Sequence, residues 1–243
     1  PKTLPALQSL CQKFPAGAGI FLRADSYWVQ PWVWGYGGGL VVPASKQILI
    51  GNTKSTAGMQ AYKNLFSSKC AFPNKDFSND YGNAQTAFKN GKVAMIVNGP
   101  WSTADILQGP AFKSSSNLGV LVIPKGPGGQ GSPVGGNGFV ISKSTKNADA
   151  AYKLMSYLTS GPAQAAWASN NNLLPSRASS YKLDAVKSNR LITAFLPQMK
   201  VATARPVIPQ GGQIYSDFGP NVQKVLNGSV TARVGMLGTA KSW

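Results

Sequence analysis

The chain has 243 residues, of which 43% are hydrophobic, so it can bury a core in one large domain or in two smaller lobes. It carries 24 Lys and Arg residues, no His and only seven acidic residues, all of them Asp, which gives a formal net charge of +17. Because general acid–base sites and metal sites depend mostly on His, Asp and Glu, this composition leaves few candidates for either. No apolar run reaches the roughly 18 residues that a membrane-spanning helix needs.

The first half of the chain predicts alternating helices and short apolar strands. We expect helices over residues 3–14, 26–40, 55–69 and 83–92, and buried strands over residues 18–24, 93–97 and 117–124. Ser55 or Thr56 is the expected cap of the third helix, and Gly91 stops the fourth. Such alternation indicates an α/β fold rather than a sandwich or a bundle.

The second half predicts one further strand, over residues 139–142, and then mostly helices. The glycine-rich residues 126–138 before it form the only candidate for a connector between two lobes. A helix behind Asn147 repeats apolar residues at helical spacing, and a second restarts with Pro162 in its first turn. The chain closes with an amphipathic stretch around Val222, Val225 and Leu226.

The two cysteines, Cys11 and Cys70, end two of the predicted helices. An even pair outside the reducing cytosol favours one disulfide, and the alternative is two small buried apolar side chains. Neither has a His or another Cys at metal-ligand spacing. We therefore predict neither a zinc site nor a redox site.

The positive charge favours polyanionic partners such as nucleic acid, cell-wall polymers or anionic lipid. The basic residues are scattered singly, however, without a Lys/Arg run or a nucleic-acid-binding motif, so we predict a solvated basic surface and no nucleic-acid partner. Two explanations of the missing Glu stay open. One is adaptation to an acidic exterior, where carboxylates are partly protonated. The other is Gln assigned by shape where the protein has Glu, in which case +17 is too high.

Aromatic residues directly follow two of the predicted strands. Trp101 comes after the strand at 93–97, and Asp25, Tyr27 and Trp28 come after the strand at 18–24. Ligands of open α/β sheets bind beyond the carboxyl ends of the strands, so we expect these side chains to face one cleft. Trp101 has a second interpretation, as a large aromatic that covers the core, and Asp25 has one as a helix N-cap.

Five segments occur in this order: PKTLPAL, GYGG, AFKNGKVAMIVNGPW, PVGGNGFVISKSTKNADAAYKLMSYLTS and NNLLPSR. Together they resemble the maltose-binding-protein-like extracellular solute-binding proteins of sugar ABC importers. The resemblance implies a two-lobe periplasmic-binding-protein-like (type II) α/β fold that holds its ligand between the lobes. Residues 1–137 and 188–243 would form an essentially complete C-terminal lobe, and residues 138–187 the helical part of the N-terminal lobe. The first segment of the N-terminal lobe is then expected on the same or another chain.

The resemblance also implies a set of ligand-binding residues. Asp25 and Tyr27 fall where a loop of the family contacts the sugar, and Trp101 and Tyr215 fall where it places stacking aromatics. Asn137 lies at the crossover between lobes and would add an amide contact. Trp28 and Ser216 are secondary candidates. Tyr215 as a core residue and Asn137 as a turn residue remain alternatives.

These expectations describe a non-enzymatic protein without a cofactor that captures a carbohydrate outside the cell or in the periplasm and delivers it to an ABC permease in the membrane. Lipid anchoring through an absent N-terminus is part of the same expectation. An anionic polyol phosphate is an alternative ligand, with Arg23 and Arg205 as candidate contacts, and a basic surface protein that binds polyanions is an alternative class. A glycoside hydrolase is disfavoured, because its two carboxylates would have to be Asp25 and Asp217.

Overall fold

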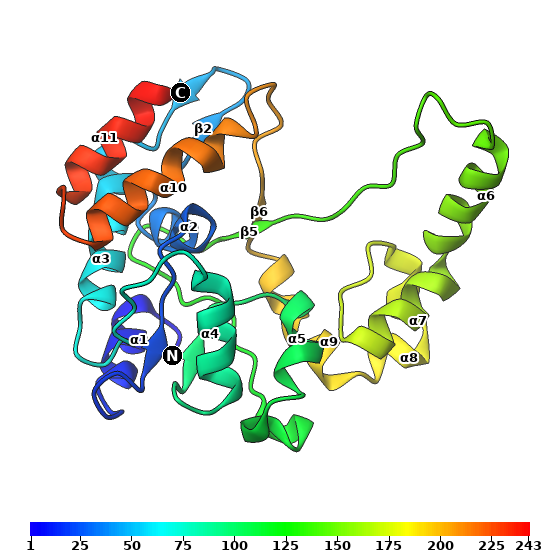
Figure 1. The fold of residues 1–243 in the computed structure, drawn as a ribbon, viewed down its shortest axis with the longest axis horizontal. Coiled ribbons are helices and arrows are strands. Elements are labelled where there is room, and N and C mark those ends of the chain that lie inside the picture. Colours follow the sequence, from blue (N-terminus) through cyan, green and yellow to red (C-terminus); the bar gives the residue numbers. More distant parts are fainter.

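The computed structural model describes residues 1–243, which form a large α/β body and a smaller helical body beside it (Figure 1). The first half contains the helices and strands α1 (Leu4–Cys11), β1 (Ile20–Phe21), α2 (Ser26–Gly35), β2 (Val41–Val42), β3 (Gln47–Ile48), α3 (Thr53–Phe66), α4 (Asp80–Lys89), β4 (Met95–Ile96) and α5 (Thr103–Ile106). The second half contains β5 (Ser132–Val134), α6 (Ala148–Leu158), α7 (Gly161–Asn171), α8 (Asp184–Lys187), α9 (Arg190–Met199), β6 (Ala202–Ala204), α10 (Gln213–Leu226) and α11 (Ala232–Ser242). No helix is both long and apolar enough to cross a membrane.

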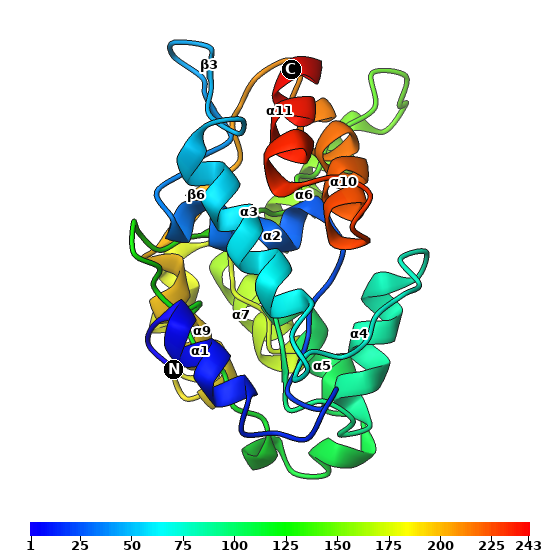
Figure 2. The ribbon, with the colours of Figure 1, turned by 90° about the vertical axis from the view of Figure 1, so that its left-hand side faces the viewer.

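The core of the large body lies between its helices. α3 packs across α2, α10 packs against both, and α11 packs against α3 and α10 (Figure 2). Trp32 and Tyr62 are fully buried where α2 meets α3, with ring centroids 4.7 Å apart in an edge-on contact. The apolar residues predicted for the last helices, around Val222 and Val225, are buried in the same core.

A disulfide joins Cys11 at the end of α1 to Cys70 beyond α3, with the two Cα atoms 5.6 Å apart. The predicted bond is therefore present. The bond ties the first helix to the segment around Cys70. This segment lies next to β1, where Gly19 donates its backbone N–H to the carbonyl oxygen of Cys70.

The strands are short and pair in twos. β1 and β4 are parallel, with Ile20 opposite Met95, and β5 and β6 are parallel, with Ser132 opposite Ala202. β2 and β3 form an antiparallel hairpin. The parallel pairing of β1 with β4 brings the segments that follow both strands to the same edge, as the sequence predicts.

All four predicted strands differ from the structure. Residues 117–124 and 139–142 form none. The strands predicted at 18–24 and 93–97 shrink to two residues each, and the second of these, β4, is only partly buried. A strand needs a hydrogen-bonded neighbour, and the first two segments have no ladder partner in this chain. Val140 accordingly remains 89% exposed.

Two helix predictions also need correction. The cap of α3 is Asn52, whose side chain accepts a hydrogen bond from the backbone of Ser55, because Ser55 itself is buried and bonds to Gly39 and Leu49. α6 begins after Asn147 as predicted, but none of its residues is buried and the Asn147 side chain makes no capping bond.

The glycine-rich segment is held in place along its first half. Gly128 donates to the carbonyl oxygen of Gly35, and Gly126 lies so close to Gly35 that a Cβ atom there would meet its carbonyl oxygen at 2.2 Å. Only glycine permits this approach. The segment then enters β5 and leaves the large body toward α6 (Figure 1).

Candidate functional site

The edge where β1 and β4 end carries three aromatic rings, which we call the aromatic platform: Tyr27, Trp28 and Trp101. Asp25 caps α2 by accepting a hydrogen bond from the backbone N–H of Tyr27 at 2.8 Å, which starts the helix at this point. Tyr27 and Trp28 therefore sit in its first turn. Trp101 lies in a short 3-10 helix, Pro100–Ser102, that follows β4.

The rings of the platform contact one another across the two segments. The ring centroids of Tyr27 and Trp28 are 5.1 Å apart, and Trp101 lies 6.5 Å from Tyr27 and 6.2 Å from Trp28. Trp101 is 49% exposed although its neighbours are partly buried. Trp101 therefore does not simply cover the core, because about half of its side chain is exposed to solvent.

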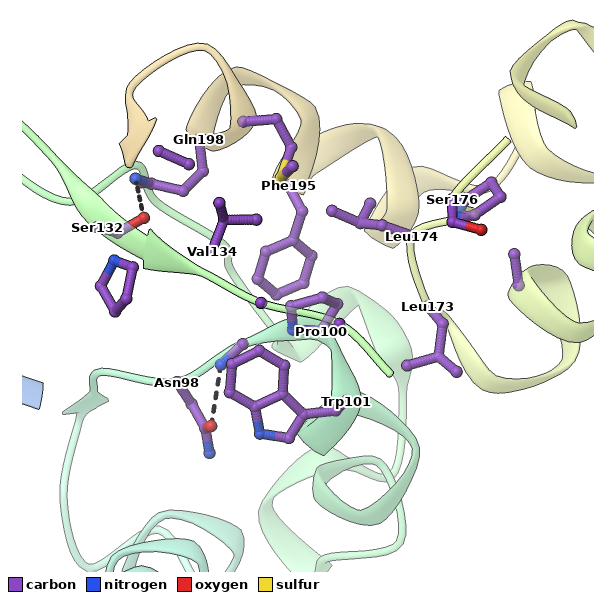
Figure 3. A pocket seen from close by; sticks show the side chains of 18 of the residues that line it. Asn98, Pro100, Trp101, Ser132, Val134, Leu173, Leu174, Ser176, Phe195 and Gln198 are labelled. Atoms are coloured by element: carbon purple, nitrogen blue, oxygen red, sulfur yellow. Dashed lines mark hydrogen bonds between the residues drawn. The ribbon is translucent and has the colours of Figure 1, made fainter. Parts of the chain in front are cut away.

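The orientation of Trp101 is fixed by the turn before it, in which Gly99 has no side chain and Asn98 makes hydrogen bonds. The Trp101 ring lies directly over Gly99, where a Cβ atom would come within 2.1 Å of the indole. The Asn98 side chain accepts from the backbone N–H of Gly99 at 2.9 Å (Figure 3). It also donates to the Gln85 side chain at 2.7 Å. The amide of Asn98 is therefore occupied within the protein.

A cleft of about 700 Å³ opens beside the platform. The platform and Asn98 line one side, and the opposite wall is mostly apolar and comes from the end of β5, from α7 and the segment after it, and from α9 (Figure 3). Its apolar side chains include Val134, Trp167, Leu173, Leu174, Phe195 and Met199. Phe195 points from α9 toward Pro100 and Trp101 (Figure 3). The cleft thus combines aromatic faces with a few polar groups, as small-molecule sites do.

Gln198 stabilises the far wall. Its amide nitrogen donates to the Ser132 hydroxyl at 2.8 Å, and its amide oxygen accepts from the backbone N–H of Ile123 at 2.7 Å. These bonds fasten α9 to β5 and to the segment before the glycine-rich loop. Sequence reasoning missed this wall. The available signal was the spacing of Leu191, Phe195 and Met199 on one side of a helix.

Of the other predicted site residues, some line the cleft and others do not. Asn137 is exposed and lines the cleft. Tyr215, at the start of α10, lies behind Tyr27 with ring centroids 6.3 Å apart, and it does not line the cleft. Ser216 is exposed and bonds to Asp217 and to the backbone of its own helix. Asp25 is exposed and serves as the cap described above.

Burial raises the pKa of both Tyr27 and Tyr215, so both hydroxyls stay protonated at neutral pH.

The two arginines considered as anion contacts differ in position. Arg23 is 2% exposed and lies behind Trp28, so it does not face the cleft. Arg205 has its guanidinium carbon 5.4 Å from the centre of the Tyr215 ring and also does not line the cleft. No group of three or more His, Cys, Asp or Glu side chains occurs that would hold a metal ion.

Comparison with known proteins identifies the family. Residues 1–194 match the family of bacterial extracellular solute-binding proteins. The chain belongs to this family.

Three proteins of known sequence or structure are similar to the solute-binding chain. The maltooligosaccharide ABC transporter solute-binding lipoprotein of Streptococcus pneumoniae strain R6 is 29% identical over 174 residues, which cover 70% of the chain and 40% of that protein. The structure of the GacH receptor of Streptomyces glaucescens, solved unliganded and with acarbose, superposes with a TM-score of 0.94 at 33% identity and covers 100% of the chain. The maltose/maltodextrin-binding domain from Bdellovibrio bacteriovorus, bound to maltotriose, gives a TM-score of 0.84 at 26% identity and also covers 100% of the chain.

The chain spans 63% of the GacH receptor and 66% of the Bdellovibrio domain. These likenesses establish a partial two-lobe fold of the maltose-binding type.

Proposed function

We propose that this solute-binding chain takes part in binding a carbohydrate, an oligosaccharide or related sugar, outside the cell and in delivering it to an ABC permease. One observation carries the proposal: three aromatic rings from the carboxyl ends of two parallel strands gather at the border of a cleft of about 700 Å³. Support comes from two similar structures, which hold acarbose and maltotriose as bound ligands. The role is binding rather than catalysis.

The chemistry of sugars fits the platform. A sugar ring has apolar C–H faces and a rim of hydroxyl groups, so its sites combine aromatic faces with amides that donate and accept hydrogen bonds. Trp101 offers the most exposed face, with Tyr27 and Trp28 beside it. In the proposal Asn137 supplies an amide to the hydroxyl rim, and Asp25, Tyr215 and Ser216 contact the ligand only at the edge of the platform.

Binding is proposed to close the cleft. The platform belongs to the large body, whereas α7 and α9 contribute to the opposite wall. A ligand that contacts both walls favours the closed arrangement by the difference in its affinity for the two states. In the proposal, this closed form is what the permease receives.

Calorimetric titration with maltotriose tests the proposal. We expect the wild-type protein to bind, Trp101→Ala to weaken binding by about tenfold or more through loss of the most exposed ring of the platform, and Tyr157→Ala to bind normally. Tyr157 is the matched control, since it is a 67% exposed aromatic on α6 that does not line the cleft. Equal affinity of Trp101→Ala and wild type would contradict the proposed site.

Two further titrations separate the alternatives. A polyanion-binding protein would lose affinity steeply as salt rises, whereas binding of a neutral sugar should change little between low and high salt. A protein for anionic polyols would bind glycerol phosphate in preference to maltotriose. Either result would overturn the carbohydrate proposal.

A further inference from the structure

Arg23 is an unusual residue to find behind the platform. It follows β1 and is 2% exposed, with its guanidinium carbon 3.8 Å from the centre of the Trp28 ring and 4.5 Å from the centre of the Tyr81 ring. The two rings come from α2 and from the first turn of α4, respectively. The planar cation therefore contacts aromatic rings from two different helices, and one of these rings belongs to the platform.

Arg23 also contacts the other segment of the platform. Its Nη2 atom donates a hydrogen bond to the carbonyl oxygen of Val97 at 3.2 Å. Val97 is the residue after β4, immediately before the turn that leads to Trp101. One side chain thus joins the segment that carries Trp28 to the segment that carries Trp101.

Burying the Arg23 cation costs more free energy than filling the same space with an apolar side chain. Burial lowers the pKa of Arg23 to about 10, which reflects the desolvation of its charge. Its Nε and Nη1 atoms are buried without a hydrogen-bond partner, and no carboxylate forms an ion pair with it. A buried apolar side chain of similar length would fill the space without these penalties. The cation is consistent with a role that depends on its planar, charged group.

We infer that Arg23 is a positioning residue for the ligand-binding platform: it fixes Trp28 and the turn before Trp101 relative to each other before the ligand arrives. The inference rests on the proposed function, because it concerns the same site. A planar guanidinium stacks flat on a ring and donates in fixed directions, whereas an ammonium group is a compact charge that cannot stack flat and whose three donors rotate. Lysine at this position should therefore not replace arginine.

Fluorine NMR of protein labelled with 5-fluorotryptophan tests the positioning without any ligand. The chain has six tryptophans, and Trp28→Phe and Trp101→Phe assign the two relevant resonances. We expect Arg23→Met and Arg23→Lys to shift or broaden the resonance of Trp101, which lies beyond Trp28 and lacks the direct stacking contact with Arg23. An unchanged Trp101 resonance in both variants would overturn the inference.

Titration with maltotriose gives the second readout. Arg23→Met and Arg23→Lys should each bind about tenfold more weakly at a temperature where both are fully folded, because the platform is no longer preorganised. The control is Arg190→Met, since Arg190 also joins backbone segments by donating to the carbonyl oxygens of Leu118 and Ser115, away from the platform. Arg190→Met should change stability but not affinity. Wild-type affinity in the folded Arg23 variants would show a structural role only and overturn the inference.

Tyr81→Leu keeps the test decisive if neither Arg23 variant folds. Tyr81 is 43% exposed, and its ring is one of the two that contact the Arg23 guanidinium, so Tyr81→Leu removes one of these contacts without changing a buried residue. The variant should move the Trp101 resonance in the same direction as the Arg23 variants, but to a smaller extent. An unmoved resonance would again contradict positioning. If wild-type protein fails to bind maltotriose, the proposed function fails, and the fluorine resonances alone decide whether Arg23 positions the platform.

Discussion

Replacing Gly99 by alanine should weaken ligand binding without weakening the fold. The added methyl group would lie 2.1 Å from Cζ3 and 2.2 Å from Cη2 of Trp101. Carbon atoms in contact are about 3.5 to 4.0 Å apart, so the edge of the indole must withdraw by about 1.5 Å. The backbone of Gly99 is extended, at φ −114° and ψ 175°, a conformation that alanine adopts freely. The change therefore displaces a side chain and not the main chain.

The expected loss follows from the stacking contact. An aromatic contact contributes about 0.5 to 1.5 kcal/mol beyond the area it buries, so a displaced Trp101 should weaken maltotriose binding by about two- to tenfold. Thermal unfolding should show an unchanged or slightly higher midpoint, because alanine lowers the entropy of the unfolded chain. Calorimetric titration and a melting curve on the same sample measure both quantities.

Gly119→Ala is the matched control, since a Cβ atom at Gly119 meets nothing within 4 Å and the residue does not line the cleft. It should leave affinity unchanged. A Gly99→Ala protein that melts several degrees lower yet binds maltotriose normally would show that the backbone yields instead of the ring. That result would refute the argument that Trp101 is held over Gly99 and contributes its face to the ligand.

Two further predictions concern the large body. The disulfide closes a loop with a sequence separation of 59, so replacing Cys11 and Cys70 by serine should lower the free energy of unfolding by about 4 kcal/mol, measured by urea denaturation; a loss below about 1 kcal/mol would contradict this. Burial raises the pKa of Asp80 from 3.8 to about 6, so the unfolded chain releases this proton first and stability should fall as pH rises from about 4 to about 6. Asp80→Asn should flatten that part of the curve, and an unchanged slope would show that another group is responsible.

The sequence predicted the platform side of the site because the signals there are local. An apolar strand followed by a turn and an aromatic residue occurs twice, and parallel pairing of β1 with β4 brings both occurrences to one edge. It could not decide between a cap and a ligand contact for Asp25, since an aspartate before a helix serves both purposes. The structure shows the capping bond, and the ligand contact stays a prediction.

The predictions that were wrong depend on partners far away in the sequence. Residues 139–142 are apolar and β-branched enough to be a strand, but a strand exists only where another strand bonds to it. The same holds for α6: its apolar residues recur at helical spacing, but the structure leaves Leu154 58% exposed. Periodicity identifies which face of a helix is apolar, and it does not identify what packs against it.

The two walls of the cleft are supported to different degrees, and this difference bears on how binding would work. The platform rests on the largest buried cluster of the protein, through Val29 and Trp32 in the same helix as Trp28. The opposite wall rests partly on a cluster of four buried residues from α7, α8 and α9. A site is precise where its side chains are fixed by packing and hydrogen bonds. Changes in the platform and in Arg23 should therefore alter the affinity of the preformed face, whereas changes in the opposite wall should alter mainly the balance between open and closed forms.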